Sequence, residues 1–296
     1  MKKTPPGRER LPSDVSRAMN CIDVVQHGFD RLDGHINSSD PTLPLEKLRS
    51  QSRRVRIKLG AKSHAPVLGT AIKVSQPSRD CLITMRDELG DANTLVLNYV
   101  EIAVDLMPHK GFSTRRIRNW VLKHLTIKYL KQRVHRPEGY KTFYLGPRAN
   151  KSGQRRPRVV AVYADRGSKL QGPHKGRMCV HIEARLTGRD ALASCGIFGV
   201  ADLIDFDFGS FWRRVAQLRR IGNAARLGGL LSGRGNVVTD KALRKRVQRL
   251  KANHKIGTAF VLQNALLAEP AIGDALEEID IDLIFRFSGE LTSGSE

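Results

Sequence analysis

A histidine and a glutamate share one face of a strand-like segment at residues 177–188. Strand alternation places His181, Glu183 and Arg185 on one side of this segment and apolar side chains on the other. An imidazole and a carboxylate that project from adjacent pleats form a two-ligand platform suited to Mg²⁺ or Mn²⁺. A surface strand with solvated polar side chains is the alternative for this segment taken alone.

Two carboxylates lie on one side of another strand-like segment, at residues 93–107. Glu101 and Asp105 share a face there, and their Cα atoms would lie roughly 13 Å apart. Because that separation is too large for both to bind one ion, we expect one to complete a metal site with His181 and Glu183. The other would pair with an arginine, since a buried carboxylate needs a cation or hydrogen bonds. Two acids at a wet strand edge are the alternative.

Tyr163 lies near the end of a third strand-like segment, 158–165, and Arg166 and Lys169 follow it closely. A phenolate can attack a phosphodiester and keep the bond energy in a 5′-phosphotyrosine link for later rejoining. Because the usual pKa of a phenol is ~10, such a tyrosine needs a nearby cation, which Arg166, Lys169 or a metal could supply. The other interpretation is a ring that closes the core.

These segments belong to a chain whose middle is rich in strands and whose last third is helical. We expect strands at 28–37, 69–75, 93–107, 141–148, 158–165 and 177–188, helices at 77–90, 113–133, 207–229, 239–255 and 257–269, and a short helix or edge segment at 45–63. This order predicts an α+β fold with helices packed on a central antiparallel sheet. The expected divisions are a partly irregular segment at 1–44, an α+β domain at 45–205, a basic helical region at 206–268 and an acidic tail at 269–296.

The charge of the chain points to a polyanionic partner. The 296 residues include 51 Lys and Arg against 29 Asp and Glu, a formal net charge of +22. Nucleic acid comes before membrane because no stretch approaches ~18 consecutive apolar residues. Residues 110–160 carry fifteen basic residues with one acid, and residues 209–258 carry thirteen with one acid. The side chains expected to bind DNA are Arg115, Arg116, Arg118, Lys123, Arg148, Arg166, Lys169, Arg185, Arg244, Lys245 and Arg246. Solvated basic helices are the alternative.

Several other classes of protein are excluded by missing patterns. The four cysteines, at 21, 81, 179 and 195, form no CxxC pair, which excludes a zinc finger and gives no disulfide framework. The glycine-rich stretch 228–236 lacks the GK[ST] of a P-loop, and the first residues lack the apolar segment of a secretory signal. We therefore expect a cytoplasmic protein without a membrane partner.

Four short motifs in order resemble the replication initiation factor family, the rolling-circle initiators of plasmids and filamentous phages. They are YVEIAVD at 99–105, TFYLGPR at 142–148, VYADRGSK at 162–169 and HIEARL at 181–186, with HGFDRL at 27–32 as a fainter addition. The chain departs from the family pattern after Tyr163, at Pro147, and at His181, where an arginine is usual. The resemblance implies a sheet of the HUH-endonuclease or ferredoxin-like type and strand nicking by a tyrosine with Mg²⁺ or Mn²⁺.

Together these features favour a rolling-circle-type initiator that binds single-stranded or origin duplex DNA. Tyr163 would be the nucleophile, with Tyr144 as the second choice. Glu183 and His181, with Glu101 or Asp105, would hold the metal, and Arg148 and Arg185 would neutralise developing charge. A non-catalytic DNA-binding or replication-control protein of a mobile element is the alternative. The sequence leaves the oligomeric state open, a homodimer included.

Overall fold

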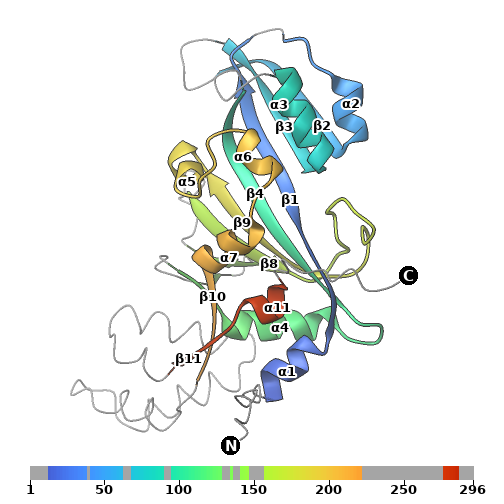
Figure 1. Cartoon of the computed structure of the whole chain (residues 1–296), viewed down its shortest axis with the longest axis vertical. Coiled ribbons are helices and arrows are strands. Elements are labelled where there is room, and N and C mark those ends of the chain that lie inside the picture. Colours follow the sequence, from blue (N-terminus) through green and yellow to red (C-terminus); the bar gives the residue numbers. More distant parts are fainter. Residues whose placement is uncertain are drawn as a thin grey trace, which may run out of the picture.

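An eight-stranded antiparallel sheet forms the centre of the computed structural model (Figure 1). The structure describes residues 13–38, 41–62, 68–89, 95–128, 134–135, 141–146, 157–221 and 276–286. The strand order is β2-β3-β1-β4-β9-β8-β7-β6. The strands are β1 Ile22–Ile36, β2 Ser52–Lys62, β3 Leu68–Pro77, β4 Leu95–Pro108, β6 Val134–His135, β7 Phe143–Leu145, β8 Arg158–Tyr163 and β9 Val180–Thr187. The predicted α+β fold with a central antiparallel sheet is confirmed.

A smaller sheet and eight described helices complete the structure. The small sheet has the order β11-β10-β5, with β5 at Leu125–Ile127, β10 at Ala216–Ile221 and β11 at Leu276–Ile279. The described helices are α1 Ser13–Met19, α2 Leu45–Ser50, α3 Arg79–Leu89, α4 Thr114–His124, α5 Arg189–Ala193, α6 Ala201–Ile204, α7 Phe208–Val215 and α11 Asp282–Phe285. No helix of the described residues is long and apolar enough to cross a membrane.

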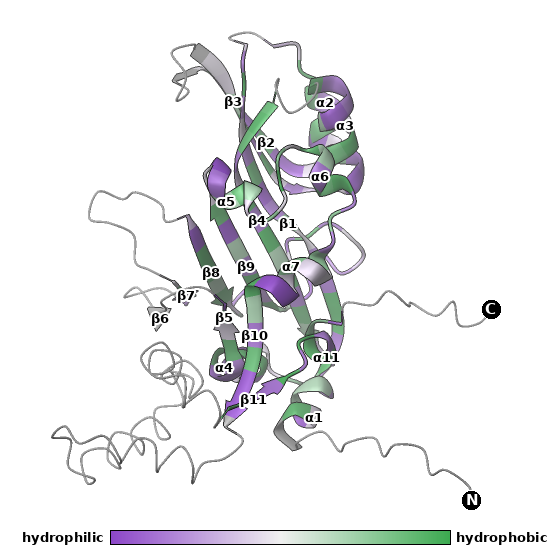
Figure 2. Cartoon of the chain, turned by 60° about the vertical axis from the view of Figure 1, so that its left-hand side comes forward, coloured by the Kyte–Doolittle hydropathy of each residue, from purple (hydrophilic) through white to green (hydrophobic). Residues whose placement is uncertain are grey.

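The main core lies on one face of the large sheet. Val100, Ile102 and Val104 of β4 are fully buried there, as strand alternation predicts. Helices α6, α7 and α11 cover this side (Figure 1). Helix α7 contributes the buried rings of Phe211 and Trp212, and α11 contributes that of Phe285. Figure 2 shows hydrophobic and hydrophilic residues interleaved along β1, β8 and β9. The polar side chains of β4 and β9 project from the opposite face, where Asp105, His181 and Glu183 are also buried.

Two predicted helices are shorter in the structure than the sequence indicated. The helix expected at 113–133 ends at His124, and the helix expected at 207–229 ends at Val215. In both cases the chain continues as a strand, because Leu125 and Leu218 pair across the small sheet and are buried. The remaining predicted helices, at 239–255 and 257–269, lie outside the described residues.

The segment at 1–44 contributes a central strand. β1 is fifteen residues long and lies between β3 and β4, so it belongs to the same sheet as the predicted site strands. Part of the acidic tail lies among the described residues. β11 pairs with β10, and Arg220 forms an ion pair with Glu277 across them. The four cysteines are free thiols.

Candidate functional site

Four neighbouring strands, β1, β4, β9 and β8, bring the predicted site residues onto one face of the sheet. Residues that lie directly opposite each other in the pairing share a face. Asp105 lies opposite His181, and Glu101 lies opposite Arg185. Tyr163 lies opposite His181 on its other side. The register therefore gathers side chains that are widely separated in the sequence.

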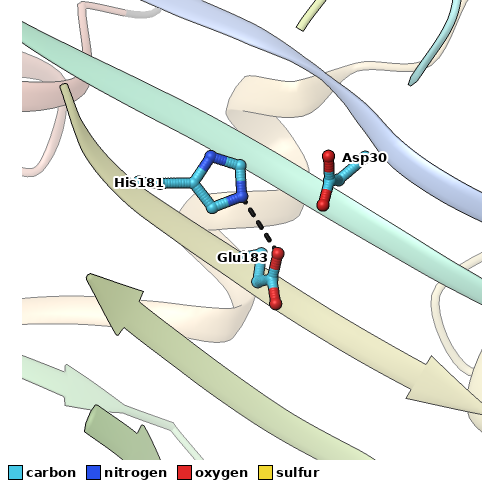
Figure 3. Close-up of side chains that lie close together, drawn as sticks. All are labelled: Asp30, His181 and Glu183. Atoms are coloured by element: carbon cyan, nitrogen blue, oxygen red, sulfur yellow. Dashed lines mark hydrogen bonds and ion pairs between the residues drawn. The ribbon is translucent and has the colours of Figure 1, made fainter. Parts of the chain in front are cut away.

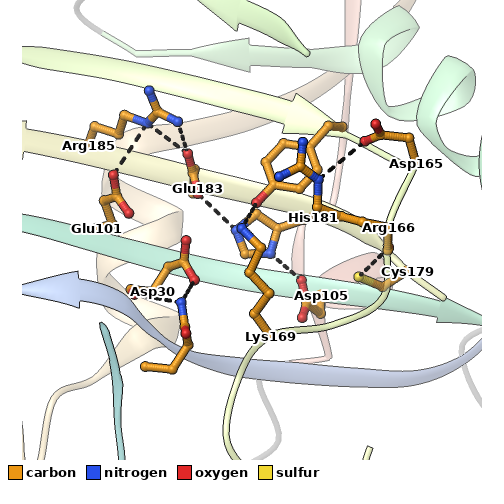
Figure 4. Close-up of polar contacts among 12 residues, drawn as sticks. Asp30, Glu101, Asp105, Asp165, Arg166, Lys169, Cys179, His181, Glu183 and Arg185 are labelled. Carbon is orange, nitrogen blue, oxygen red and sulfur yellow. Dashed lines mark hydrogen bonds and ion pairs between the residues drawn. The ribbon is translucent and has the colours of Figure 1, made fainter. Parts of the chain in front are cut away.

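His181 is held between two carboxylates and is 2% exposed (Figure 4). Its Nδ1 lies 2.5 Å from Asp105 Oδ1, and its Nε2 lies 3.0 Å from Glu183 Oε2. Burial lowers the pKa of His181, but the hydrogen bonds to both acids outweigh burial and raise the pKa above its usual range. Burial raises the pKa of Glu183, but His181 and Arg185 outweigh burial and hold it below its usual range.

Asp30 of β1 completes a group of three possible metal ligands (Figure 3). One ligand atom each from Asp30, His181 and Glu183 lies within 4.8 Å of the others, and all three residues are buried. Asp30 sits at a register shift in the β1–β4 pairing, and such a bulge re-aims a side chain. Gln76 Nε2 donates to the backbone carbonyl of Asp30 at 2.9 Å and also to its carboxylate. We call these three residues the Asp30 cluster.

Sequence reasoning did not assign Asp30 a role. Its position lies within the HGFDRL segment at 27–32, so the resemblance contained the signal. Alternation along β1 could not reveal its direction, because the bulge interrupts the period of two.

Glu101 and Asp105 lie beside the Asp30 cluster. Asp105 Oδ1 contacts Nδ1 of His181, the ring nitrogen that does not face Glu183. The second oxygen of Asp105, Oδ2, has no hydrogen-bond partner in the described part of the chain. Glu101 accepts a hydrogen bond from Tyr99 and lies 3.7 Å from Arg185 Nε. Burial and the nearby Glu183 raise the pKa of Glu101 to about 7, although Tyr99 and Arg185 oppose that rise. A neutral form of Glu101 is therefore accessible near neutral pH.

Arg185 links the two glutamates of the site. Its guanidinium donates to Glu183 Oε1, at 2.7 Å from Nε and with a second, shorter contact from Nη2. The same guanidinium lies 5.4 Å from the ring centre of Tyr144. Both contacts reach the same oxygen of Glu183, while His181 holds the other, so Arg185 neutralises part of the carboxylate charge.

Tyr163 stacks on His181, with ring centres 4.7 Å apart, and is 4% exposed. Lys169 Nζ lies 3.5 Å from the Tyr163 hydroxyl, and the guanidinium of Arg166 lies 4.8 Å from the ring centre. Burial and the nearby acids raise the pKa of the phenol above its usual range, although Arg166 opposes them. Tyr144 lies half-buried on β7, opposite Ala161 of β8, which in turn lies opposite Glu183.

The chain between β8 and β9 folds over this end of the polar face. We call residues 164–179 the covering loop. Gln26 Nε2 of β1 donates to the carbonyl of Gln171 at 2.6 Å. A Cβ added at Gly28 would lie 3.2 Å from a methyl carbon of Leu170, so glycine lets the covering loop approach β1 closely. The loop also supplies Arg166 and Lys169 to Tyr163.

The residues expected to bind DNA occupy several places. Arg166, Lys169 and Arg185 lie at the site, as described above. Arg115, Arg116 and Lys123 are exposed on α4, whereas Arg118 is half-buried 5.1 Å from the ring centre of Phe143. Phe143 faces away from the side of β7 that carries Tyr144, so α4 packs on the opposite sheet face from the Asp30 cluster. Arg148, Arg244, Lys245 and Arg246 lie outside the described residues.

Comparisons with known proteins identified a distant structural neighbour. No protein-family model matches the chain, and no curated protein matches it. A solved structure described as the rolling circle replication initiator protein from Geobacillus stearothermophilus is similar to this chain. The match covers 67% of this chain and 88% of the chain in that structure. The identity is 15% and the TM-score is 0.35.

Proposed function

We propose that this protein is a rolling-circle-type replication initiator that binds origin DNA and nicks and rejoins one strand. The observation that carries this proposal is the Asp30 cluster, which lies beside Tyr163 on the polar face of the sheet, beneath the covering loop. The net charge of +22 supports a nucleic-acid substrate. The family resemblance of the sequence motifs supports the same reaction.

The residues of the Asp30 cluster fit a divalent metal. One imidazole nitrogen and two carboxylates are ligands that Mn²⁺ accepts, and Mg²⁺ accepts the carboxylates. Asp105 would keep Nδ1 of His181, as carboxylates behind metal-bound histidines commonly do, and an ion at Nε2 would replace the hydrogen bond between Nε2 and Glu183. When bound, such an ion polarises a phosphate oxygen. Glu101 and Asp105 would support this centre from outside it.

The chain's own residues would carry the nicking step. The hydroxyl oxygen of Tyr163 would form a bond to phosphorus while the bond from phosphorus to the 3′ oxygen breaks. The products are a 5′-phosphotyrosine and a free 3′ hydroxyl, which takes up one proton while the phenol gives up one. Lys169 and Arg166 stabilise the phenolate, and reversal of the step rejoins the strand. Because Tyr163 is 4% exposed, the covering loop must move for DNA to reach it.

A covalent adduct tests this proposal. The protein is incubated with a pool of single-stranded oligonucleotides and Mn²⁺, and a denaturing gel shows whether protein and DNA become linked. We expect an adduct that disappears with Glu183→Gln and with Tyr163→Phe but persists with Tyr144→Phe. An adduct that survives Tyr163→Phe and disappears with Tyr144→Phe would move the nucleophile to Tyr144. No adduct with any divalent metal would refute nicking.

A non-catalytic DNA-binding or replication-control protein is the second candidate. Two observations favour it: His181 already has an acid at each ring nitrogen, and burial raises the pKa of Tyr163. Such a protein would use the His181 ion pairs as a structural support and would need no metal. It would bind origin DNA tightly without an adduct, so the same gel distinguishes the two functions.

A further inference from the structure

A groove of about 940 Å³ lies on the polar sheet face, next to the candidate site. Its floor is formed by β3, β1 and β4, including Lys73, Asp33 and Tyr99. One wall is β2, with Arg56 and Lys58, and the other is the end of β9 and the start of α5, with Arg189. This volume is near the upper end of the range of about 300–1,000 Å³ for small-molecule sites, so the groove has room for more than one small anion.

The strand register explains why the groove is so basic. Arg56 lies opposite Lys73, Lys73 opposite Asp33, Asp33 opposite Tyr99, and Tyr99 opposite Thr187, so one straight row crosses five strands. At about 4.8 Å between strands this row is about 19 Å long. Helices α2 and α3 pack on the other side of these strands, so they leave the row open (Figure 1).

The cations of the groove are available to a ligand. Arg56, Lys58 and Arg189 are exposed, and no carboxylate of the described chain forms an ion pair with them. Asp33, the one acid among the lining residues, already has Arg31 Nε at 2.6 Å and Lys73 Nζ at 3.7 Å. If these were only the solvated side chains of one charged strand, all of them would lie on β2. Here the cations lie on both walls of the groove.

The groove leads toward the Asp30 cluster. Tyr99 lies on the groove floor and donates its hydroxyl proton to Glu101, the next residue on the same face of β4. Ala103 follows on that face and lies opposite Glu183. The groove row and the row of Glu183 are therefore four residues apart along β4, about 13 Å.

We propose that a single DNA strand crosses this groove along the row, with phosphates at the β2 cations on one wall and at Arg189 on the other. From Arg189 it would continue to the Asp30 cluster. This inference rests on the proposed function for the identity of the nucleic acid. A row of about 19 Å holds roughly five nucleotides at the ~3.4 Å rise of a stacked strand. His35 and Asn98 also line the groove, 3.4 Å apart at Nδ1 and Nδ2, and their other polar atoms can bond to bases.

Salt-dependent binding tests the groove. Binding of a fluorescent oligo-dT of about 20 nucleotides is measured by anisotropy with EDTA present, so that no cleavage occurs. The binding constant K falls with salt, and each lost phosphate contact reduces the steepness of log K against log salt by about 0.7 for a single strand. The slope changes below are changes in this steepness. Arg56→Gln with Lys58→Gln should lower the slope by about 1.4 and weaken binding about ten-fold near 150 mM salt. Arg189→Gln should lower the slope by about 0.7 and weaken binding about four-fold.

The matched control is Arg49→Gln with Arg53→Gln, which removes the same charge from the same region. Arg53 lies on β2 but faces away from Arg54 and Arg56, and Arg49 is on α2. An equal loss with the control pair would show general charge attraction and would overturn the proposal. An unchanged affinity with Arg189→Gln would equally overturn it, because the strand would not span both walls. A duplex of equal length that binds as tightly would refute the single strand.

The groove and the proposed nicking reaction can fail separately. Loss of affinity in the groove variants without any adduct from the unaltered protein would support the groove and refute nicking. An adduct from protein whose groove variants bind normally would support nicking and refute the groove. Unchanged urea midpoints in the groove variants show that these exposed substitutions leave the fold intact.

Discussion

His27 should make the protein less stable in mildly acidic solution. This residue lies on β1, and its Nε2 donates a hydrogen bond to the carbonyl of Phe285 in α11 at 3.0 Å. Its ring centre also lies 5.8 Å from that of Phe208. Burial lowers the pKa of His27 from 6.5 to about 4, although the Phe285 carbonyl and Asp105 oppose that change. The folded protein therefore binds this proton less readily than the unfolded chain does.

The sign and size of the effect follow from these two pKa values. The neutral ring stabilises the fold fully above pH 6.5, and this contribution is lost as the pH falls through 6.5 toward 4. A difference of that size corresponds to about 3 kcal/mol at most. Because part of the ring is accessible to water, we expect a loss of about 2 kcal/mol between pH 7.5 and 4.5.

The assay compares urea unfolding of the native protein and of His27→Gln at pH 7.5, 5.5 and 4.5. Glutamine can still donate a hydrogen bond to Phe285 but does not titrate. The unfolding free energy of the native protein minus that of His27→Gln should therefore fall by about 2 kcal/mol from pH 7.5 to pH 4.5. His174→Gln, in the covering loop, is the matched control for replacing a histidine away from α11. If the His27→Gln and native curves stay parallel, burial does not depress this pKa and the reasoning is wrong.

Substitutions at three further positions test the site and the core. Asp105→Asn should weaken Mn²⁺ binding about 10–100-fold, measured by calorimetry, because it changes the group that orients His181; unchanged affinity would remove Asp105 from the metal centre. Arg185→Met should lower the unfolding free energy by about 3 kcal/mol in urea at pH 7.5, because Glu183 loses a buried ion-pair partner. Arg185→Lys should cost less, and equal losses would show that packing matters more than charge. Trp212→Ala should cost about 3–5 kcal/mol because the ring is fully buried against Phe211 and Phe285, and Trp212→Phe should cost less; a loss below about 1 kcal/mol would contradict this core.

The sequence predicted the site strands well because alternation is a local property. The period of two on β4 and β9 correctly placed Glu101 with Asp105, and His181 with Glu183 and Arg185. Which residue of β4 faces which residue of β9 depends on register, which is set by contacts distant in the sequence. The contact of Asp105 with His181 therefore emerged only from the fold.

The helix ends were less predictable for a related reason. The apolar positions of 113–133 and 207–229 fit a helical period, yet Leu125 and Leu218 are buried as strand residues. Short apolar runs fit either structure, and the small sheet that selects between them is assembled from three distant segments. Asp30 was missed because a bulge, rather than a residue type, directs its side chain.

Strand β2 has a second consequence for the behaviour of the protein in solution. In the described part of the chain it is one of the two outer strands of the large sheet, and an outer strand is a template on which another molecule can add its own strand. Arg53, Arg54, Arg56 and Lys58 charge both of its faces, and a register shift before Ala61 interrupts its pairing with β3. Two copies that approach edge to edge would bring these cations together. The distance over which such charges repel each other, the Debye length, falls from about 10 Å at 0.1 M salt to about 3 Å at 1 M. Self-association and aggregation through this edge should therefore increase with ionic strength.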